Sequence, residues 1–392
     1  MDRYTQVDRI AQRYVDANRF SNIEWHVERD GTTLTRGNVG YADALNKVPV
    51  PEQALYRIYS MTKPIVTAVA LILIERGQLR LYDPLAKYDR RFGQMRVLQP
   101  DGQLLPAARL ITVEDLMTHR AGFTYEFITG CHIAPLYERQ RISGDGECDF
   151  EEMMERLSRL PLAFHPGDRF RYSVATDVLG WVCEKASGQA LDELVQQLIF
   201  DPLEMVDTAY HVPESKQARL MPMFGIADLS EFLPLNPVEQ TLKPARVERM
   251  YPSDKPGVFR RGGHGLFSTL NDYSKFARML LDGKTADGAT VLSRKTLELM
   301  RTNRLPAAQR PVRVGMLALP GFGFGLGVRV LVDPGQTMNL GSVGEFGWSG
   351  AASTYFWVDP VERVSGVFMT QYLGSTLPLA EDLRTAVYQQ LD

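Results

Sequence analysis

The chain has 392 residues, 44% of them hydrophobic, and its 44 Lys and Arg against 47 Asp and Glu leave a net charge of −3. Such a length exceeds one compact core, so two structural lobes are expected. The near-neutral charge, with Lys and Arg scattered along the chain, argues against a nucleic-acid partner. The longest apolar run covers only residues 65–74, whereas a membrane span needs roughly twenty residues, so no membrane span is expected.

The N-terminal segment and the cysteines indicate a location. Residues 1–14 are charged and lack the apolar core of a signal peptide. The three cysteines, Cys131, Cys148 and Cys183, are odd in number and lack CxxC spacing. Free thiols in a reducing compartment fit this pattern better than a disulfide framework. The sequence therefore predicts a cytoplasmic protein and leaves its oligomeric state open.

In chain order, the pattern begins with an amphipathic helix and a β-hairpin. The helix is predicted over residues 3–18, and the hairpin joins two β-rich runs through Asp30-Gly31, a strong hairpin signal. A proline-rich segment over 213–255 is expected to be a long surface excursion that packs over another part of the molecule, and such excursions often shape a pocket. The other predicted helices are 60–76, a segment opening at Thr112, 149–160, 176–187, 191–199, 271–281, 293–300 and 377–391, and the later β-runs are 322–332, 344–358 and 364–372.

The order of these elements predicts an α+β fold. The β-rich runs lie at the two ends of the chain, and the predicted helices lie mostly between them. We therefore expect one α/β lobe formed by residues 1–88 and 316–392, with a mainly helical lobe, residues 89–315, inserted into it. A site at the junction could draw side chains from both lobes.

The stretch Tyr59-Ser-Met-Thr-Lys63-Pro64 stands at the start of the apolar run. Residues i and i+3 share a helix face, so Ser60 and Lys63 can bring a hydroxyl and an amine together. A serine nucleophile needs a neighbour to take its proton, and a helix start offers unpaired N–H groups to an oxyanion. The spacing alone also fits a capped core helix whose lysine reaches toward the surface. Pro64 would deprive the Ser60 carbonyl of its usual donor, which predicts an irregular backbone.

Three further stretches suit such a site. Tyr172 stands at a loop-to-helix junction and could act as a general base, although a tyrosine there could equally pack by its ring and cap the helix. The glycines in 344–352 predict a close approach to the backbone and a second oxyanion donor, or else a bulge or tight packing. Residues 261–269 read as a sharp turn feeding a capped helix.

Together and in this order, the four stretches resemble the serine β-lactamase-like hydrolases, and most closely the family VIII carboxylesterases. The resemblance covers nearly the whole chain and implies the β-lactamase/transpeptidase-like fold, an antiparallel sheet flanked by N- and C-terminal helices with an inserted helical domain. The matching segments are Ser60-Met-Thr-Lys63, Leu116-Met-Thr-His-Arg-Ala-Gly122, Tyr172-Ser-Val174, Gly262-Gly-His-Gly-Leu-Phe-Ser-Thr269 and Trp348-Ser-Gly350. It implies that Ser60 is the nucleophile, that Lys63 keeps Tyr172 deprotonated or shares its proton, and that Tyr172 is the general base. The N–H groups of Ser60 and Ala351 would form the oxyanion hole.

The departures from the family pattern predict the substrate. β-Lactamases and peptidases of this fold carry Lys-Thr-Gly and Tyr-x-Asn where this chain has Trp348-Ser349-Gly350 and Val174. An indole in place of a cation removes the partner of an anionic substrate and suits a neutral ester. Hydrolysis of short-chain carboxylic esters is therefore expected, with weak β-lactam turnover. The sequence does not separate this from an acyltransferase, and a β-lactamase, a D-amino-peptidase or an inert binding protein of this fold are the remaining alternatives.

Other catalytic classes have little support. The chain has neither the Gly-x-Ser-x-Gly of α/β-hydrolases nor His-Glu-x-x-His among its six histidines. Glycines at 321, 323, 325 and 327 miss the register of a dinucleotide-binding loop and mark a strand. We therefore expect neither a metal nor another cofactor. His119 and His264 are expected to brace loops near the site.

Overall fold

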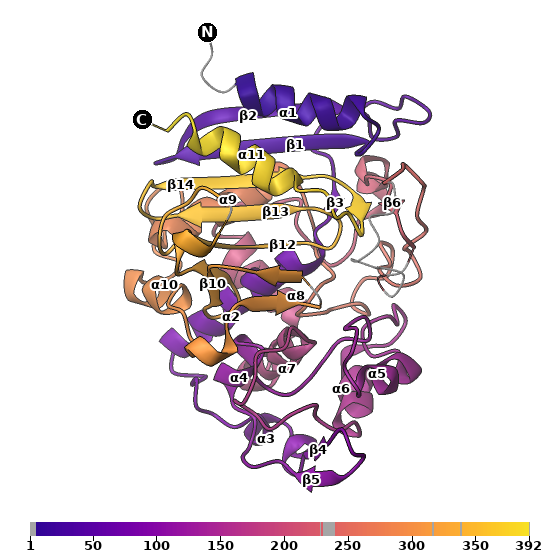
Figure 1. The fold of residues 1–392 in the computed structure, drawn as a ribbon, viewed down its shortest axis with the longest axis vertical. Coiled ribbons are helices and arrows are strands. Elements are labelled where there is room, and N and C mark those ends of the chain that lie inside the picture. Colours follow the sequence, from indigo (N-terminus) through magenta and orange to yellow (C-terminus); the bar gives the residue numbers. More distant parts are fainter. Residues whose placement is uncertain (1–4, 228, 230–239, 316, 338, 392) are drawn as a thin grey trace.

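A seven-stranded antiparallel sheet forms the upper half of the molecule (Figure 1). The computed structural model describes residues 5–227, 229, 240–315, 317–337 and 339–391. The strands, from one edge to the other, are β10 (Phe322–Phe324), β11 (Arg329–Leu331), β12 (Phe346–Ser349), β13 (Tyr355–Asp359), β14 (Val364–Met369), β1 (Asn22–Arg29) and β2 (Thr32–Gly40). Pairing of β1 with β14 joins the two ends of the chain, as the sequence predicts.

Helices cover both faces of this sheet. Helices α1 (Thr5–Asp16) and α11 (Leu379–Tyr388) pack on one face, and α9 (Leu270–Asp282) packs on the other against β13, β14 and β1 (Figure 1). Successive side chains of a strand point to opposite faces. Accordingly Trp357 joins the α1–α11 cluster, whereas Phe356 and Val358 join the core on the α9 side.

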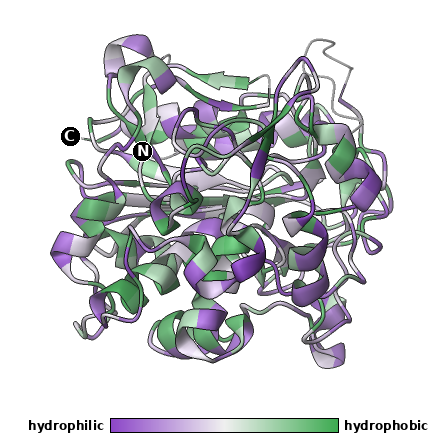
Figure 2. Cartoon of the chain, turned by 90° about the horizontal axis from the view of Figure 1, so that it is seen from below, coloured by the Kyte–Doolittle hydropathy of each residue, from purple (hydrophilic) through white to green (hydrophobic). Residues whose placement is uncertain are grey.

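The lower half is mainly helical, and α2 (Thr62–Glu75) is its buried centre. Its apolar run is buried almost throughout, and it packs against α7 (Ala175–Ser187). Viewed from this end, the peripheral helices carry hydrophilic residues beside hydrophobic ones (Figure 2). The other helices of this half are α3 (Leu85–Tyr88), α4 (Val113–Met117), α5 (Ala134–Gln140), α6 (Phe150–Ser158) and α8 (Leu191–Val195), whereas α10 (Arg294–Met300) contacts α9.

Short strand pairs tie the connecting segments together. The pair β3 (Tyr56–Arg57) and β7 (Phe267–Ser268) brings the segment before Ser60 against residues 261–269. A parallel pair, β6 (Phe224–Gly225) and β15 (Tyr372–Leu373), attaches part of the proline-rich segment to the sheet end. The remaining pairs are β4 (Arg96–Leu98) with β5 (Leu104–Pro106), and β8 (Val312–Val314) with β9 (Leu317–Leu319).

Most predicted elements are confirmed, with some shifts at their ends. The Asp30-Gly31 hairpin forms, and Thr112 and Asp115 make the expected capping box of α4. The β-run 322–332 is two strands, because Gly327, with φ of +72°, turns the chain back between β10 and β11. Likewise 344–358 is the hairpin of β12 and β13.

The proline-rich segment 213–255 lies partly outside the described residues, at 228 and 230–239. Its described parts contribute buried side chains, including Met221, Met223 and Tyr251, so they pack over other parts of the molecule, as the sequence predicts. The three-part division at residues 88 and 315 stays a prediction. Helix α9 falls inside the range 89–315 although it packs on the sheet.

Two further observations concern the chain as a whole. Among the described residues, every helix is too short or too polar to cross a membrane. Cys131, Cys148 and Cys183 are buried and free of disulfides. A cytoplasmic location stays a prediction.

Candidate active site

Ser60 lies in a short 3₁₀ turn, Tyr59–Met61, that leads directly into α2. Tyr59 has a φ of +44°, in the left-handed region that non-glycine residues rarely adopt. Such a conformation costs of order 1 kcal/mol and persists only where the surroundings hold it. The Tyr59 ring packs against Tyr251, with centroids 4.8 Å apart. The irregular backbone expected from Pro64 is therefore present, just before the helix.

The three predicted catalytic side chains meet at the Ser60 hydroxyl. The Tyr172 hydroxyl donates to Ser60 Oγ over 2.6 Å, and Lys63 Nζ donates to the same atom over 3.2 Å. Lys63 and Tyr172 are only 1% and 4% exposed, so both polar ends work away from bulk water. Since a buried Lys–Tyr–Ser contact can relay a proton from the serine hydroxyl, the geometry suits activation of Ser60 as a nucleophile.

Trp348 adds a contact that the sequence did not predict. Its indole Nε1 donates to the Tyr172 oxygen over 3.3 Å, and the two rings lie 5.4 Å apart. The Tyr172 oxygen therefore receives an N–H from Trp348 while its own hydroxyl donates to Ser60. Trp348 was expected only as an apolar wall, because nothing in the sequence tells which edge of the indole faces the tyrosine.

The glycine at position 350 brings the end of β12 against the Ser60 turn. A Cβ there would lie 2.4 Å from the carbonyl oxygen of Ile58, so only glycine allows this approach. The close approach predicted from the glycines of 344–352 is thus confirmed. Within the described part of the chain, the backbone N–H groups of Ser60 and Ala351 donate to no other residue, which leaves both available to an oxyanion.

The remaining predicted substrate-binding residues differ in accessibility. Ser349 is exposed at the end of β12, and Gly350 is buried beside it. Val174 is completely buried in the core, and its N–H donates to the Thr124 carbonyl over 3.3 Å. A contact between the Val174 side chain and a substrate stays a prediction.

The two histidines brace the walls of the site, as expected. The Ser173 N–H donates to His119 Nδ1 over 3.3 Å, and the imidazole lies 4.8 Å from the Tyr172 ring. Burial, assisted by the Lys63 charge, holds the pKa of His119 well below its usual range, so this imidazole is neutral. His264 packs against Tyr251 and Phe259, and burial lowers its pKa as well.

Two further groups contact Lys63 that the sequence did not assign to the site. The Gly263 carbonyl accepts from Lys63 Nζ over 2.6 Å, and the Tyr125 ring centroid lies 5.3 Å from the same nitrogen. Residues 261–269 were predicted to be a structural turn, and the role of Gly263 was not predicted. A backbone carbonyl that accepts a hydrogen bond cannot be recognised from the type of its residue. The doubled glycine at 262–263 is the one available signal.

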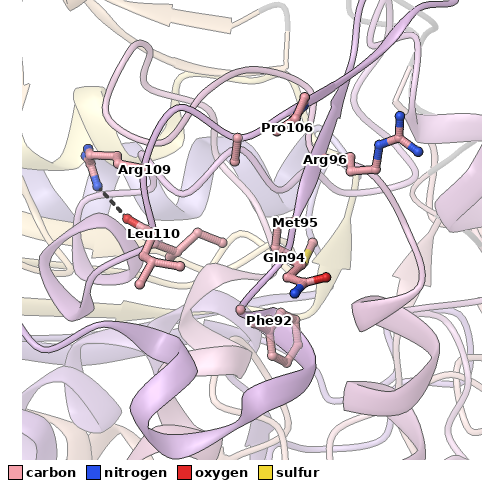
Figure 3. A pocket seen from close by; sticks show the side chains of 10 residues that line it. Phe92, Gln94, Met95, Arg96, Pro106, Arg109 and Leu110 are labelled. Carbon is pink, nitrogen blue, oxygen red and sulfur yellow. Dashed lines mark hydrogen bonds between the residues drawn. The ribbon is translucent and has the colours of Figure 1, made fainter.

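Two surface hollows, one lined by residues between 92 and 111 and one by residues between 211 and 256, do not involve these side chains. A surface pocket of about 600 Å³ is formed by residues around the β4–β5 hairpin, where Arg109 donates to the Leu110 carbonyl over 2.9 Å (Figure 3). Its lining residues, 92–96, 106, 107 and 109–111, include none of the three catalytic candidates. Among the described residues, His, Cys, Asp and Glu side chains form no group that could hold a metal ion.

Comparison with known proteins relates the whole chain to one family. The profile of the Beta-lactamase family matches residues 7–390. The chain is 33% identical over 367 residues to Protein Rv1367c of Mycobacterium tuberculosis (strain ATCC 25618 / H37Rv), covering 91% of this chain and 87% of that protein. It is 31% identical over 379 residues to Esterase EstB of Burkholderia gladioli, covering 92% and 89%.

A solved structure shows the same architecture. The structure of EstCE1, "a hydrolase with promiscuous acyltransferase activity", matches with a TM-score of 0.82 and 24% identity, covering 99% of this chain and 98% of that one. The fold is therefore the β-lactamase/transpeptidase-like α+β fold that the sequence predicted.

Proposed function

The chain belongs to the Beta-lactamase family, and from this membership we propose that it is a serine carboxylesterase of the family VIII type, cleaving short-chain carboxylic esters through an acyl-Ser60 intermediate. The observation that carries the proposal is the meeting of Tyr172 Oη and Lys63 Nζ at Ser60 Oγ. Esterase EstB, at 31% identity over nearly the whole chain, supports the ester substrate.

In the acylation half, Ser60 Oγ attacks the ester carbonyl carbon and gives its proton to the Tyr172 oxygen, with Lys63 sharing that proton. The carbonyl oxygen becomes an oxyanion between the N–H groups of Ser60 and Ala351. When the tetrahedral intermediate collapses, the ester C–O bond breaks and Tyr172 returns the proton to the leaving alcohol. The acyl group remains on Ser60.

In the deacylation half, water takes the place of the alcohol. Tyr172 accepts a proton from that water, the resulting hydroxide attacks the acyl carbon, and the proton returns to Ser60 Oγ as the acid leaves. The Trp348 N–H acts in both halves, since it donates to the Tyr172 oxygen when that oxygen carries negative charge.

The indole also bears on the choice of substrate. Trp348 is 3% exposed and packs between Tyr172 and Phe324, so it presents an aromatic edge where a β-lactamase has a lysine. A carboxylate-bearing β-lactam gains no counter-charge from it. We expect Trp348→Lys to raise β-lactam turnover relative to ester turnover; an unchanged ratio would argue against this account of specificity.

The main test uses a chromogenic short-chain ester with wild-type protein and Ser60→Ala. We expect turnover by the wild type, none above background by Ser60→Ala, and a fluorophosphonate adduct on Ser60 by mass spectrometry. Ser274→Ala is a matched control, because Ser274 is a buried helical serine that donates to the Leu270 carbonyl. Failure of every ester, lactam and fluorophosphonate to acylate Ser60 would favour a binding protein of this fold.

Acyl transfer to an alcohol is the second candidate, and the aromatic surroundings of the nucleophile favour it. The buried rings of Tyr125 and Tyr172 lie 5.3 and 4.7 Å from Lys63 Nζ, and Trp348 packs against Tyr172. Such aromatic walls disfavour water relative to an organic alcohol. Adding an alcohol acceptor to the ester assay and measuring the new ester against free acid separates the two outcomes. A graded series of acyl chains in the same assay defines the preferred substrate.

A further inference from the structure

Asp177 is connected to Lys63 by hydrogen bonds through a single intervening residue, Gly263. It stands in the first turn of α7, is completely buried, and its Oδ1 accepts from the Gly263 N–H over 2.9 Å. The carbonyl of the same Gly263 accepts from Lys63 Nζ over 2.6 Å. Glycine 263 therefore connects a buried carboxylate to the buried ammonium of the active site.

The packing around this connection leaves no room for another residue. A Cβ on Gly263 would lie 2.5 Å from Asp177 Oδ2 and 2.9 Å from Tyr125 Oη. A Cβ on Gly262 would lie 2.1 Å from the Thr176 carbonyl oxygen. The doubled glycine is thus explained by the first turn of α7, against which it is pressed. The Gly263 backbone is held by Asp177 at its N–H and by Lys63 at its carbonyl.

The carboxylate faces charges of the opposite sign. Lys63 and Arg261, which are 1% and 0% exposed, both act on it electrostatically, and the buried hydroxyls of Tyr125 and Tyr210 lie within its field. Burial raises the pKa of the Asp177 carboxyl, whereas Lys63, the Gly263 N–H and Arg261 act in the opposite direction. Asp177 Oδ2 has no hydrogen-bond partner among the described residues. Because this oxygen makes no hydrogen bond but faces two buried cations, the presence of a carboxylate here is explained better by charge attraction than by hydrogen bonding.

We propose that Asp177 is a positioning residue of the Ser60–Lys63–Tyr172 site, which fixes the Gly263 carbonyl as an acceptor for Lys63 and provides the negative charge opposite that buried ammonium. The catalytic part of this inference rests on the proposed function. The electrostatic part of the inference does not rest on the proposed function, since it concerns a pair of buried charges in the protein without substrate.

The catalytic part is tested by the pH dependence of ester turnover in Asp177→Asn. An amide keeps an oxygen for the Gly263 N–H and removes the charge. Without the carboxylate, the Lys63–Tyr172 system loses its proton more easily, so we expect the acid limb of kcat/KM to move by about one unit to lower pH and the maximum to fall roughly tenfold. Asp177→Ala, which also releases Gly263, should lose more.

Asp272→Asn is the matched control. Asp272 is also a buried carboxylate in the first turn of a helix, accepts the Asp207 N–H over 2.7 Å, and has a pKa raised by burial. We expect its acid limb to coincide with that of the wild type. An acid limb of Asp177→Asn that also coincides with the wild type would overturn the charge role, because a merely structural residue lowers the rate without moving this limb.

The electrostatic part is tested by thermal unfolding, which needs no substrate. Lys63→Met leaves the Asp177 carboxylate buried without its cation, so we expect a fall in Tm of several degrees at pH 8 and a smaller fall at pH 5. Adding Asp177→Asn to Lys63→Met should restore part of that loss. Losses that simply add in the double variant would overturn the pairing of the two charges, whatever reaction the protein catalyses.

Discussion

Strand β12 joins two buried charged clusters that are built in opposite ways. Just before its first residue lies Glu345, completely buried, which accepts from Arg329 Nη1 over 3.2 Å, from Arg384 Nη2 and from the Tyr388 hydroxyl over 3.2 Å. We call this set the sheet-end cluster. At the other end, Trp348 contacts Tyr172 beside Lys63.

The two clusters differ in how completely their carboxylates are paired. In the sheet-end cluster both carboxylate oxygens of Glu345 have donors, and each arginine also donates to the Tyr355 hydroxyl. Around Lys63, by contrast, Asp177 Oδ2 and His119 Nε2 have no partner among the described residues. Arg384 Nε also lacks a partner among the described residues, so the difference lies in the two carboxylates. A carboxylate with donors on both oxygens makes a buried network rigid, whereas one with an unpaired oxygen costs stability and is typical of a site under functional constraint. Loss of the Glu345 carboxylate should therefore lower stability without lowering turnover, whereas changes around Lys63 should lower turnover.

The largest expected effect is on turnover, from the active-site cluster. Lys63→Ala and Tyr172→Phe should each lower kcat/KM by about 10³–10⁴-fold, or about 4–5.5 kcal/mol of transition-state free energy, because Ser60 loses its proton acceptor. Steady-state kinetics with a chromogenic ester measure this. Tyr14→Phe, whose lost hydroxyl donates to Asp382 in the α1–α11 cluster, should leave the rate unchanged. A Tyr172→Phe variant with near-normal kcat would contradict the base role.

The next effect is on stability, from the sheet-end cluster. Glu345→Ala leaves Arg329 and Arg384 buried without their carboxylate, and breaking a buried ionic network in this way costs about 3–5 kcal/mol. Chemical denaturation should show this loss, while kcat of the remaining folded protein stays close to wild type. The control is Glu147→Ala, because Glu147 pairs with Lys255 on the surface. The free energy of unfolding of this variant should not change. An equal fall in kcat for Glu345→Ala would mean that the clusters are not independent.

A smaller effect tests the link between β12 and the base. Trp348→Phe keeps an aromatic ring but removes the N–H that donates to Tyr172, so we expect about a tenfold fall in kcat with KM little changed. In this variant the contribution of the sheet-end cluster to thermal stability should stay unchanged. A rise in KM without any change in kcat would instead indicate that the indole acts only as a wall for substrate.

The sequence predicted one of these clusters and not the other. Ser60, Lys63 and Tyr172 could be assigned because a reaction needs those residue types in a recognisable order along the chain. Arg329 lies on β11, Arg384 on α11 and Glu345 just before β12, and no spacing indicates that they meet in the interior. Burial of charge depends on tertiary packing, which periodicity does not report.

Within the active site, the sequence could not predict where backbone groups lie or which edge of a ring faces a neighbour. The Gly263 carbonyl and the direction of the Trp348 N–H are properties of conformation. Gly350 was identified because a glycine in a strand is itself a sign of close approach, and the structure shows the Ile58 carbonyl there. Residue identity predicts the chemistry of this site, while the geometry that orients it comes from how α2, α7 and β12 pack.

The smallest expected effect separates the pH dependence of stability from that of turnover. Burial, with smaller contributions from Arg36 and Arg278, lowers the pKa of His26 on β1 to about 4, against about 6.5 in an unfolded chain. Between these values the unfolded state binds more protons, so stability is complete above pH 6.5 and is lost as the pH falls toward 4. By pH 5 this loss should reach about 1–2 kcal/mol. His26→Gln should therefore show a smaller drop in Tm from pH 7 to pH 5 than the wild type or the exposed control His132→Gln, with an unchanged acid limb of kcat/KM. If His26→Gln moved that limb, the pH dependence of turnover would not belong to the groups around Lys63 alone.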